Sequence, residues 1–166
     1  MNEALNSGQF AEELAELHDG SIGLFVTLPV LRSLMISEQR AAVLATFEAL
    51  IGEHLSCLDG ILGDVLVRRD RSDGDLTRSL FRSISALRVW PATAERDDEI
   101  LGIVEQAQLF LMGSCSFALR SARLARVDGA VQVLEESLAR LGSLAVQLVT
   151  PPWEVHSRFE LSDAVA

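Results

Sequence analysis

The chain has 166 residues, of which 49% are hydrophobic and 23% charged, so we expect one globular domain and exclude a disordered or fibrous protein. Its 14 basic residues against 24 acidic ones give a net charge of −10, which argues against a nucleic-acid partner. All 14 basic residues are arginines, so the chemistry of lysine, such as Schiff-base catalysis and a P-loop lysine, is excluded.

The N-terminal residues and the apolar runs predict the cellular location, because the former lack a signal peptide and the latter are too short to cross a membrane. Residues 1–10 contain neither the basic nor the apolar region of a signal peptide, so we expect a cytoplasmic protein. The longest uncharged runs, 20–31 and 106–119, are shorter than the roughly 18 residues that a membrane span needs. We therefore expect no membrane contact. Cys57 and Cys115 form no CxxC pair and are predicted to be buried as small apolar residues.

Helical periodicity dominates the sequence, and the predicted fold class is all-α. A first helix is predicted over Gly8–Leu31, with Pro29 in its last turn or at a kink. Its apolar stripe comprises Phe10, Leu14, Leu17, Leu24 and Leu28. Ser37 is a plausible N-cap for a second helix over Glu38 to about Val67. The stripe of that helix comprises Leu44, Phe47, Ile51, Leu55, Leu58, Leu62 and Val65.

A charged stretch separates this first pair of helices from the rest of the chain. Residues 68–75 contain Gly74 and no apolar side chain, so they are predicted to form a solvated connection. A short helix with Leu76, Leu80, Ile84 and Leu87 follows and ends before Trp90-Pro91.

Two further long helices are predicted after the short one. Asp97 or Asp98 can cap a helix that continues to about Arg126, with Val104, Gln108, Leu111, Cys115 and Ala122 facing inward. Asp128 can cap the last helix, over 129–149. The long connection between the second and third long helices predicts a ferritin-like antiparallel four-helix bundle with a short extra helix in the crossover. Residues 1–150 would form this single domain, and residues 151–166 a C-terminal arm.

Several short segments then resemble those of a known family. They are Leu17–Phe25 with the sequence LHDGSIGLF, Ser72–Leu76 with the later Leu80–Arg82 and Trp90, and Asp97–Leu101 with Val104 and Glu105. In this order they resemble a bacterial ferritin-like domain family of unknown function, similar to the rubrerythrins, over roughly 10–149. A stress-associated ferritin-like family matches less well. The resemblance implies a bundle that is often dimeric and whose better-equipped relatives bind two metal ions among inward carboxylates.

The ligands of such a di-metal site are missing from the predicted inward positions. Di-iron bundles use about six ligands, including a Glu-x-x-His from each of two helices, and this sequence contains no Glu-x-x-His. Projection at about 100° per residue leaves Glu135 on the flank of the last helix and turns Glu136 away from the interior. Where the metal-binding relatives carry a glutamate, this chain has Gln108, so we expect no cofactor and no intact metal site.

The polar side chains left near the interior are few. They are Ser21, His54, Gln108 and Cys115, with His18 at a boundary and Glu105 at the edge. We expect them to satisfy one another by hydrogen bonds, because an unpaired buried amide costs about 1–3 kcal/mol. The alternative is a partial site for one soft or borderline ion, with His54, Gln108, Cys115 and Glu105 as its weak candidates.

A catalytic triad is not supported, since Ser56, Cys57 and Asp59 lie near His54 in sequence but on different helix faces. We therefore expect no enzymatic activity.

Two surface features predict contacts with other proteins. Basic residues gather in and after the charged connection, namely Arg68, Arg69, Arg71, Arg78 and Arg82. They either pair with the chain's own acidic helices or dock an acidic partner. Phe110 and Phe117 lie off the inward line of the third long helix, as does Phe25 in the first, and such extra apolar faces favour a homodimer. We expect a non-catalytic dimeric structural or protein-interaction module; the alternative is a divergent metal-binding or oxidative-stress protein.

Overall fold

A computed structural model describes residues 2–64 and 74–149, and side-chain detail within 6–63 and 74–143. The described residues form five helices and no strand, which confirms the all-α class. The helices are α1 (Asn2–Leu34), α2 (Glu38–Asp64), α3 (Asp75–Leu87), α4 (Ala94–Ala125) and α5 (Asp128–Val149). The predicted C-terminal arm, the charged connection up to residue 73 and the predicted end of the second helix lie outside the described residues.

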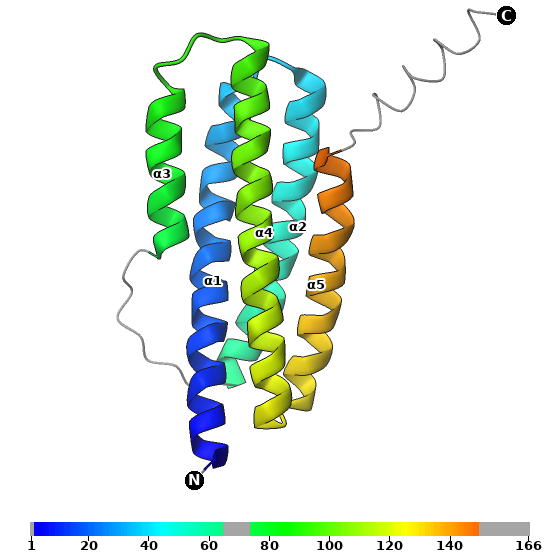
Figure 1. Cartoon of the computed structure of the whole chain (residues 1–166). Helices are drawn as coiled ribbons and strands as arrows, with labels where there is room; N and C mark the ends of the chain where they lie inside the picture. Colours follow the sequence, from blue (N-terminus) through cyan, green and yellow to red (C-terminus); the bar gives the residue numbers. More distant parts are fainter. Residues whose placement is uncertain (1, 65–73, 150–166) are drawn as a thin grey trace, which may run out of the picture.

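The four long helices pack around a common interior. α1 contacts α2 and α4, and α5 closes the ring by contacting the same two helices. α1 and α5 run in one direction, α2 and α4 in the other (Figure 1). The short helix α3 lies outside this ring, against α1 and α4, where Figure 1 shows it beside the upper half of α1. The predicted short helix in the crossover is thus present.

The core consists of the predicted apolar stripes. Fully buried residues from the four long helices include Phe10, Leu14, Leu17, Leu24, Leu28, Leu44, Phe47, Ile51, Leu58, Val104, Leu111, Cys115, Ala122, Leu134 and Leu141. Leu55 and Leu62 pack against this cluster from its edge. Burial of such side chains stabilises the fold by roughly 1.5–3 kcal/mol each.

The predicted bounds of α1 are wrong at both ends. The helix begins six residues before Gly8 and continues past Pro29 to Leu34, so Pro29 lies inside it. Pro29 lies on the exposed side of the helix. The helix continues because Leu31 is fully buried, and its packing offsets the roughly 3 kcal/mol that an internal proline costs.

α3 approaches α1 closely at a glycine. A Cβ atom at Gly23 would lie 2.0 Å from Oγ1 and 2.9 Å from Cβ of Thr77, so only glycine leaves room for this contact. Thr77 is buried together with Leu80, Ile84 and Leu87, the inward face of α3. The glycine therefore sets the distance between the short helix and the ring.

The predicted start of α4 is also wrong. The helix begins at Ala94, after Thr93 in an extended N-cap conformation, and neither Asp97 nor Asp98 caps it. Asp97 is buried and instead bonds backbone N–H groups of the α1–α2 connection. The predicted N-cap of α2 is confirmed, because the Ser37 hydroxyl accepts the N–H of Arg40 at 3.3 Å.

Three helical stretches are long and apolar enough, by length and composition alone, to cross a membrane. They are Asn6–Leu34, Glu38–Gly63 and Ala94–Ala125. The lengths of the uncharged runs did not predict these stretches, because a stretch of this kind can contain one or two charged residues.

Candidate functional site

The polar residues predicted to face inward are buried, but the contacts found are to neighbouring backbone and to α5 rather than to one another. Ser21, fully buried, donates its hydroxyl to the carbonyl oxygen of Leu17 at 2.7 Å. Cys115, also fully buried, donates its S–H to the carbonyl oxygen of Leu134 on α5 at 3.5 Å. Burial raises the pKa of the Cys115 thiol to about 11, so the group stays protonated and is a poor metal ligand at neutral pH.

His54 reaches across the interior from α2 to α5. Its Nδ1 atom hydrogen-bonds with the Ser137 hydroxyl at 3.0 Å, while its buried Nε2 atom has no protein partner. Burial, and to a smaller extent the electrostatic effect of the nearby His18, lower the pKa of His54 to about 4. His54 is therefore neutral at physiological pH and acts as a polar link between α2 and α5.

Gln108 makes the corresponding link from α4. Its amide nitrogen donates to the carbonyl oxygen of Leu141, one turn beyond Ser137 on α5, and its Oε1 atom has no protein partner. His54 and Gln108 are thus each tied to α5 through one polar atom. The prediction that the inward polar residues satisfy one another is therefore wrong: their partners are a backbone carbonyl of α1 and groups of α5, and His54 and Gln108 each leave one atom without a protein partner.

The four weak metal candidates do not assemble. Glu105 is half-buried on α4, whereas His54, Gln108 and Cys115 are each engaged with α5. Within residues 6–63 and 74–143, no three His, Cys, Asp or Glu side chains form a group that could hold a metal ion. Among the described residues, the four candidates therefore share no common site.

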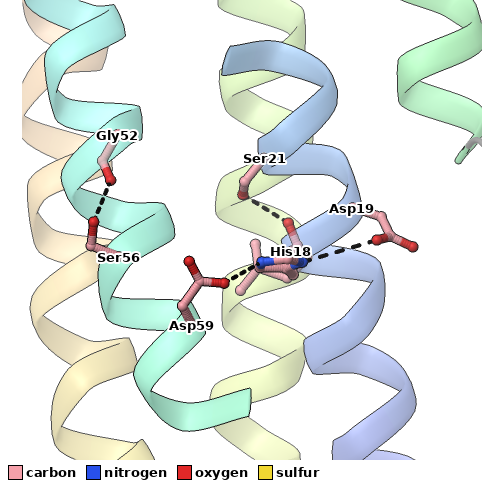
Figure 2. Close-up of polar contacts among 7 residues, drawn as sticks. His18, Asp19, Ser21, Gly52, Ser56 and Asp59 are labelled. Carbon is pink, nitrogen blue, oxygen red and sulfur yellow. Dashed lines mark hydrogen bonds and ion pairs between the residues drawn. The ribbon is translucent and has the colours of Figure 1, made fainter. Parts of the chain in front are cut away.

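A histidine–carboxylate pair that sequence reasoning missed connects α1 to α2. His18 Nε2 lies 2.8 Å from Oδ1 of Asp59, and its Nδ1 lies 4.0 Å from Oδ1 of Asp19. Figure 2 shows the His18 ring lying between the two carboxylates. His18 and Asp59 are 41 residues apart on different helices, so no local pattern in the sequence could reveal this pair.

This pair does not form a triad with a nucleophile. The Ser56 hydroxyl donates to the carbonyl oxygen of Gly52 at 3.1 Å, which directs it along its own helix rather than toward a histidine (Figure 2). His54 bonds Ser137, as described above, and not Asp59. A nucleophile, a base and an orienting acid are therefore not brought together in these contacts.

The predicted arginine patch is described only in part. Arg68, Arg69 and Arg71 lie outside the described residues. Arg78 is exposed on α3 and pairs with Asp75, one turn earlier on the same helix, and Arg82 is exposed. Local pairing accounts for the Arg78 charge, which makes this part of the patch a weak docking signal.

The outer face of α4 is the strongest surface feature. Four apolar side chains repeat there at helical spacing, away from the buried stripe of the same helix. We name them the outer α4 stripe: Leu109 (57% exposed), Phe110 (38%), Phe117 (63%) and Leu124 (54%). The predicted exposure of Phe110 and Phe117 agrees with the structure.

A groove of about 430 Å³ follows this stripe where α4 meets α1, and we name it the α1–α4 groove. It is lined by Glu13, Glu16, Leu109, Phe110, Gly113, Ser114 and Phe117. Phe110 also lines a second cavity of about 290 Å³ between α3 and α4. An exposed apolar stripe beside a groove with an acidic wall is typical of a protein-binding surface.

A second exposed apolar group lies on α1. Ile22, Phe25 and Val26 are 36%, 38% and 50% exposed, and Phe25 lies against Gly52 of α2. This position places the group on the side of α1 that faces α2, away from the α1–α4 groove.

No protein-family model matches the sequence, and no curated protein matches it.

Proposed function

We propose that the protein is a non-catalytic helical bundle of ferritin-like connectivity, located in the cytoplasm, that acts as a dimeric structural or protein-interaction module. The observation that carries this proposal is the outer α4 stripe with its groove. Phe117 and Leu109 are more than half exposed, and large apolar side chains grouped in this way favour burial against a second protein surface.

The ferritin-like part of the proposal is supported by the helix order. Two antiparallel pairs, α1 with α2 and α4 with α5, are joined by a connection that contains α3 (Figure 1). This is the order expected of a bundle with one long crossover.

The non-catalytic part is supported by the bonds of the candidate groups. His54, Gln108 and Cys115 each connect two helices, and Asp59 pairs with His18. Groups held in this way contribute to the packing of the bundle.

A cytoplasmic location is supported by the common core. The three stretches long enough to cross a membrane each supply fully buried residues to that core, such as Leu24, Ile51 and Leu111. The net charge of −10 also disfavours binding to an anionic lipid surface.

Light scattering on two matched variants tests the proposal. Phe117→Gln removes an exposed apolar side chain from the stripe, and Ile36→Gln removes one that is 52% exposed in the α1–α2 connection. We expect a wild-type dimer that Phe117→Gln weakens and Ile36→Gln leaves intact. A wild-type chain that is monomeric and binds no protein partner contradicts the proposal.

A further inference from the structure

The charges beside the α1–α4 groove are segregated by helix. α1 carries Glu12, Glu13, Glu16 and Asp19 and no arginine before Arg32. α4 carries only Arg120 and Arg123 as charged residues after Glu105. One wall of the groove is therefore acidic, and the neighbouring helix is basic toward its C-terminal end.

A hydrogen bond shows that these opposite charges lie at the same height of the molecule. The Ser121 hydroxyl donates to the Glu13 carboxylate at 2.6 Å across the antiparallel pair α1 and α4. Because an α-helix rises about 1.5 Å per residue, Glu16 and Arg120 differ in height by only about 3 Å. Glu16 and Arg120 therefore lie at nearly the same height along the bundle.

Two exposed charges at this level, one on each helix, are not used within the chain. Glu16 and Arg120 are both exposed, and neither side chain has an ion pair or hydrogen bond within the part of the chain that the structure describes. Glu13 is instead held by Ser121 and Gln9, and Arg123 pairs with Glu135 at 2.6 Å. Glu16 and Arg120 therefore remain available to a partner.

We propose that the occupant of the α1–α4 groove is a second copy of this chain, related by a two-fold axis parallel to the helices. This inference rests on the proposed function, because it names the surface of the proposed dimer. Such an axis places α1 of one copy opposite α4 of the other and keeps each residue at its own height. Glu16 of each copy then faces Arg120 of the other, around a centre made of Phe110 and Phe117.

The charges select this axis over the other simple arrangement. A two-fold axis perpendicular to the helices at this level sets α1 against α1 and α4 against α4. Glu16 would then face the acidic residues on α1 of the second copy, and Arg120 would face the arginines on its α4. Because like charges opposed across an interface weaken binding, the parallel axis is favoured.

Charge reversal tests the proposed pairing. In a symmetric dimer, either Glu16→Arg or Arg120→Glu places like charges face to face at both copies of this pair. We therefore expect each variant alone to raise the dimer Kd about tenfold or more. Mixing the two variants restores opposite charges at both positions. We expect the mixture, and the double variant Glu16→Arg/Arg120→Glu, to associate with a Kd near that of the wild-type chain, measured by analytical ultracentrifugation.

A second pair of variants tests the groove without using these charges. Gly113 lines the groove, and a Cβ atom at Gly113 or at Gly60 on α2 would meet no atom within 4 Å, so both helices tolerate a side chain there. We expect Gly113→Glu to weaken the dimer about tenfold or more and Gly60→Glu to leave it unchanged.

The possible outcomes separate the inference from the function on which it rests. A wild-type dimer that neither the charge reversals nor Gly113→Glu weakens overturns the groove as its interface and leaves the proposed function standing. Single variants that weaken the dimer but do not associate when mixed overturn the pairing of Glu16 with Arg120. A monomeric wild-type chain that floats with phosphatidylcholine vesicles overturns both proposals and identifies a membrane as the occupant.

Discussion

The carboxylate of Asp97 on α4 accepts the backbone N–H of Ser37 at 2.9 Å, so the start of one long helix holds the start of another. Its second oxygen accepts the N–H of Ile36 at 3.0 Å. Arg96, the preceding residue, donates to the carbonyl oxygens of Leu34 and Trp90. The α1–α2 connection is therefore anchored to α4 by two adjacent and almost fully buried side chains.

Replacing Asp97 tests the strength of this anchor. Asp97→Ala leaves two backbone N–H groups without their acceptor, and we expect the free energy of unfolding in urea to fall by about 1–3 kcal/mol. Asp97→Asn keeps one acceptor oxygen and should cost less. The control is Asp98→Asn, since Asp98 is exposed and pairs with Arg40 at 2.6 Å, which predicts a change of at most about 1 kcal/mol. Equal losses for Asp97→Ala and Asp98→Asn would contradict this account.

Gly23→Ala should loosen the contact between α3 and α1. The added Cβ would lie 2.0 Å from the Thr77 hydroxyl oxygen, so we expect a loss of about 1–3 kcal/mol in the free energy of unfolding. Gly60→Ala has open space around its Cβ and should stabilise the chain by up to about 1 kcal/mol through helix propensity. Thr77→Ala in the Gly23→Ala background should recover part of the loss. A Gly23→Ala chain as stable as Gly60→Ala would show that α3 does not approach α1 at this residue.

His54 should make the fold sensitive to acid. Burial lowers the pKa of His54 from its ordinary value of 6.5 to about 4 in the folded chain. Between these two pH values the unfolded chain binds more protons, so the free energy of unfolding falls as pH falls from 6.5 to 4. The stabilisation that comes from neutral His54 is fully present above pH 6.5. By pH 4 the free energy of unfolding should have fallen by about 3 kcal/mol.

The variant His54→Gln separates this effect from the titration of carboxylates. It carries no titratable group at this position, so its stability in urea should change less over the same pH range than that of the wild-type chain. Identical pH profiles for both proteins would show that His54 is not buried as a neutral side chain.

The two cysteines should differ in their reaction with thiol reagents. Burial raises the pKa of the Cys115 thiol to about 11, whereas Cys57 is half-buried. Because the thiolate is the reactive form, we expect iodoacetamide to modify Cys57 in the native protein and Cys115 only after denaturation. Peptide mass mapping distinguishes the two sites. Equal modification of both under native conditions would contradict the burial of Cys115.

The sequence predicted the core well because helical periodicity reports burial directly. The inward line through Val104, Gln108, Leu111 and Cys115 is buried in full, as predicted. Helix ends were less predictable, since they depend on contacts between helices. Asp97 has the sequence features of an N-cap, yet it serves the connection before α2, and only the folded arrangement shows this.

The polar contacts illustrate the same limit. Projection placed His54 and Gln108 inside, but their partners on α5, Ser137 and the Leu141 carbonyl, follow from the register between helices. The pair His18 and Asp59 also depends on that register. The exposed Phe117, by contrast, was predicted, because an apolar residue off the inward line is visible in the sequence alone.

The central claim, a dimeric module without metal chemistry, is tested most directly by light scattering and elemental analysis on one sample of protein purified without chelator. The account predicts a particle of twice the 18.1 kDa chain mass with no stoichiometric iron or manganese. Two metal ions per chain, or a monomer across a broad dilution series, would contradict it.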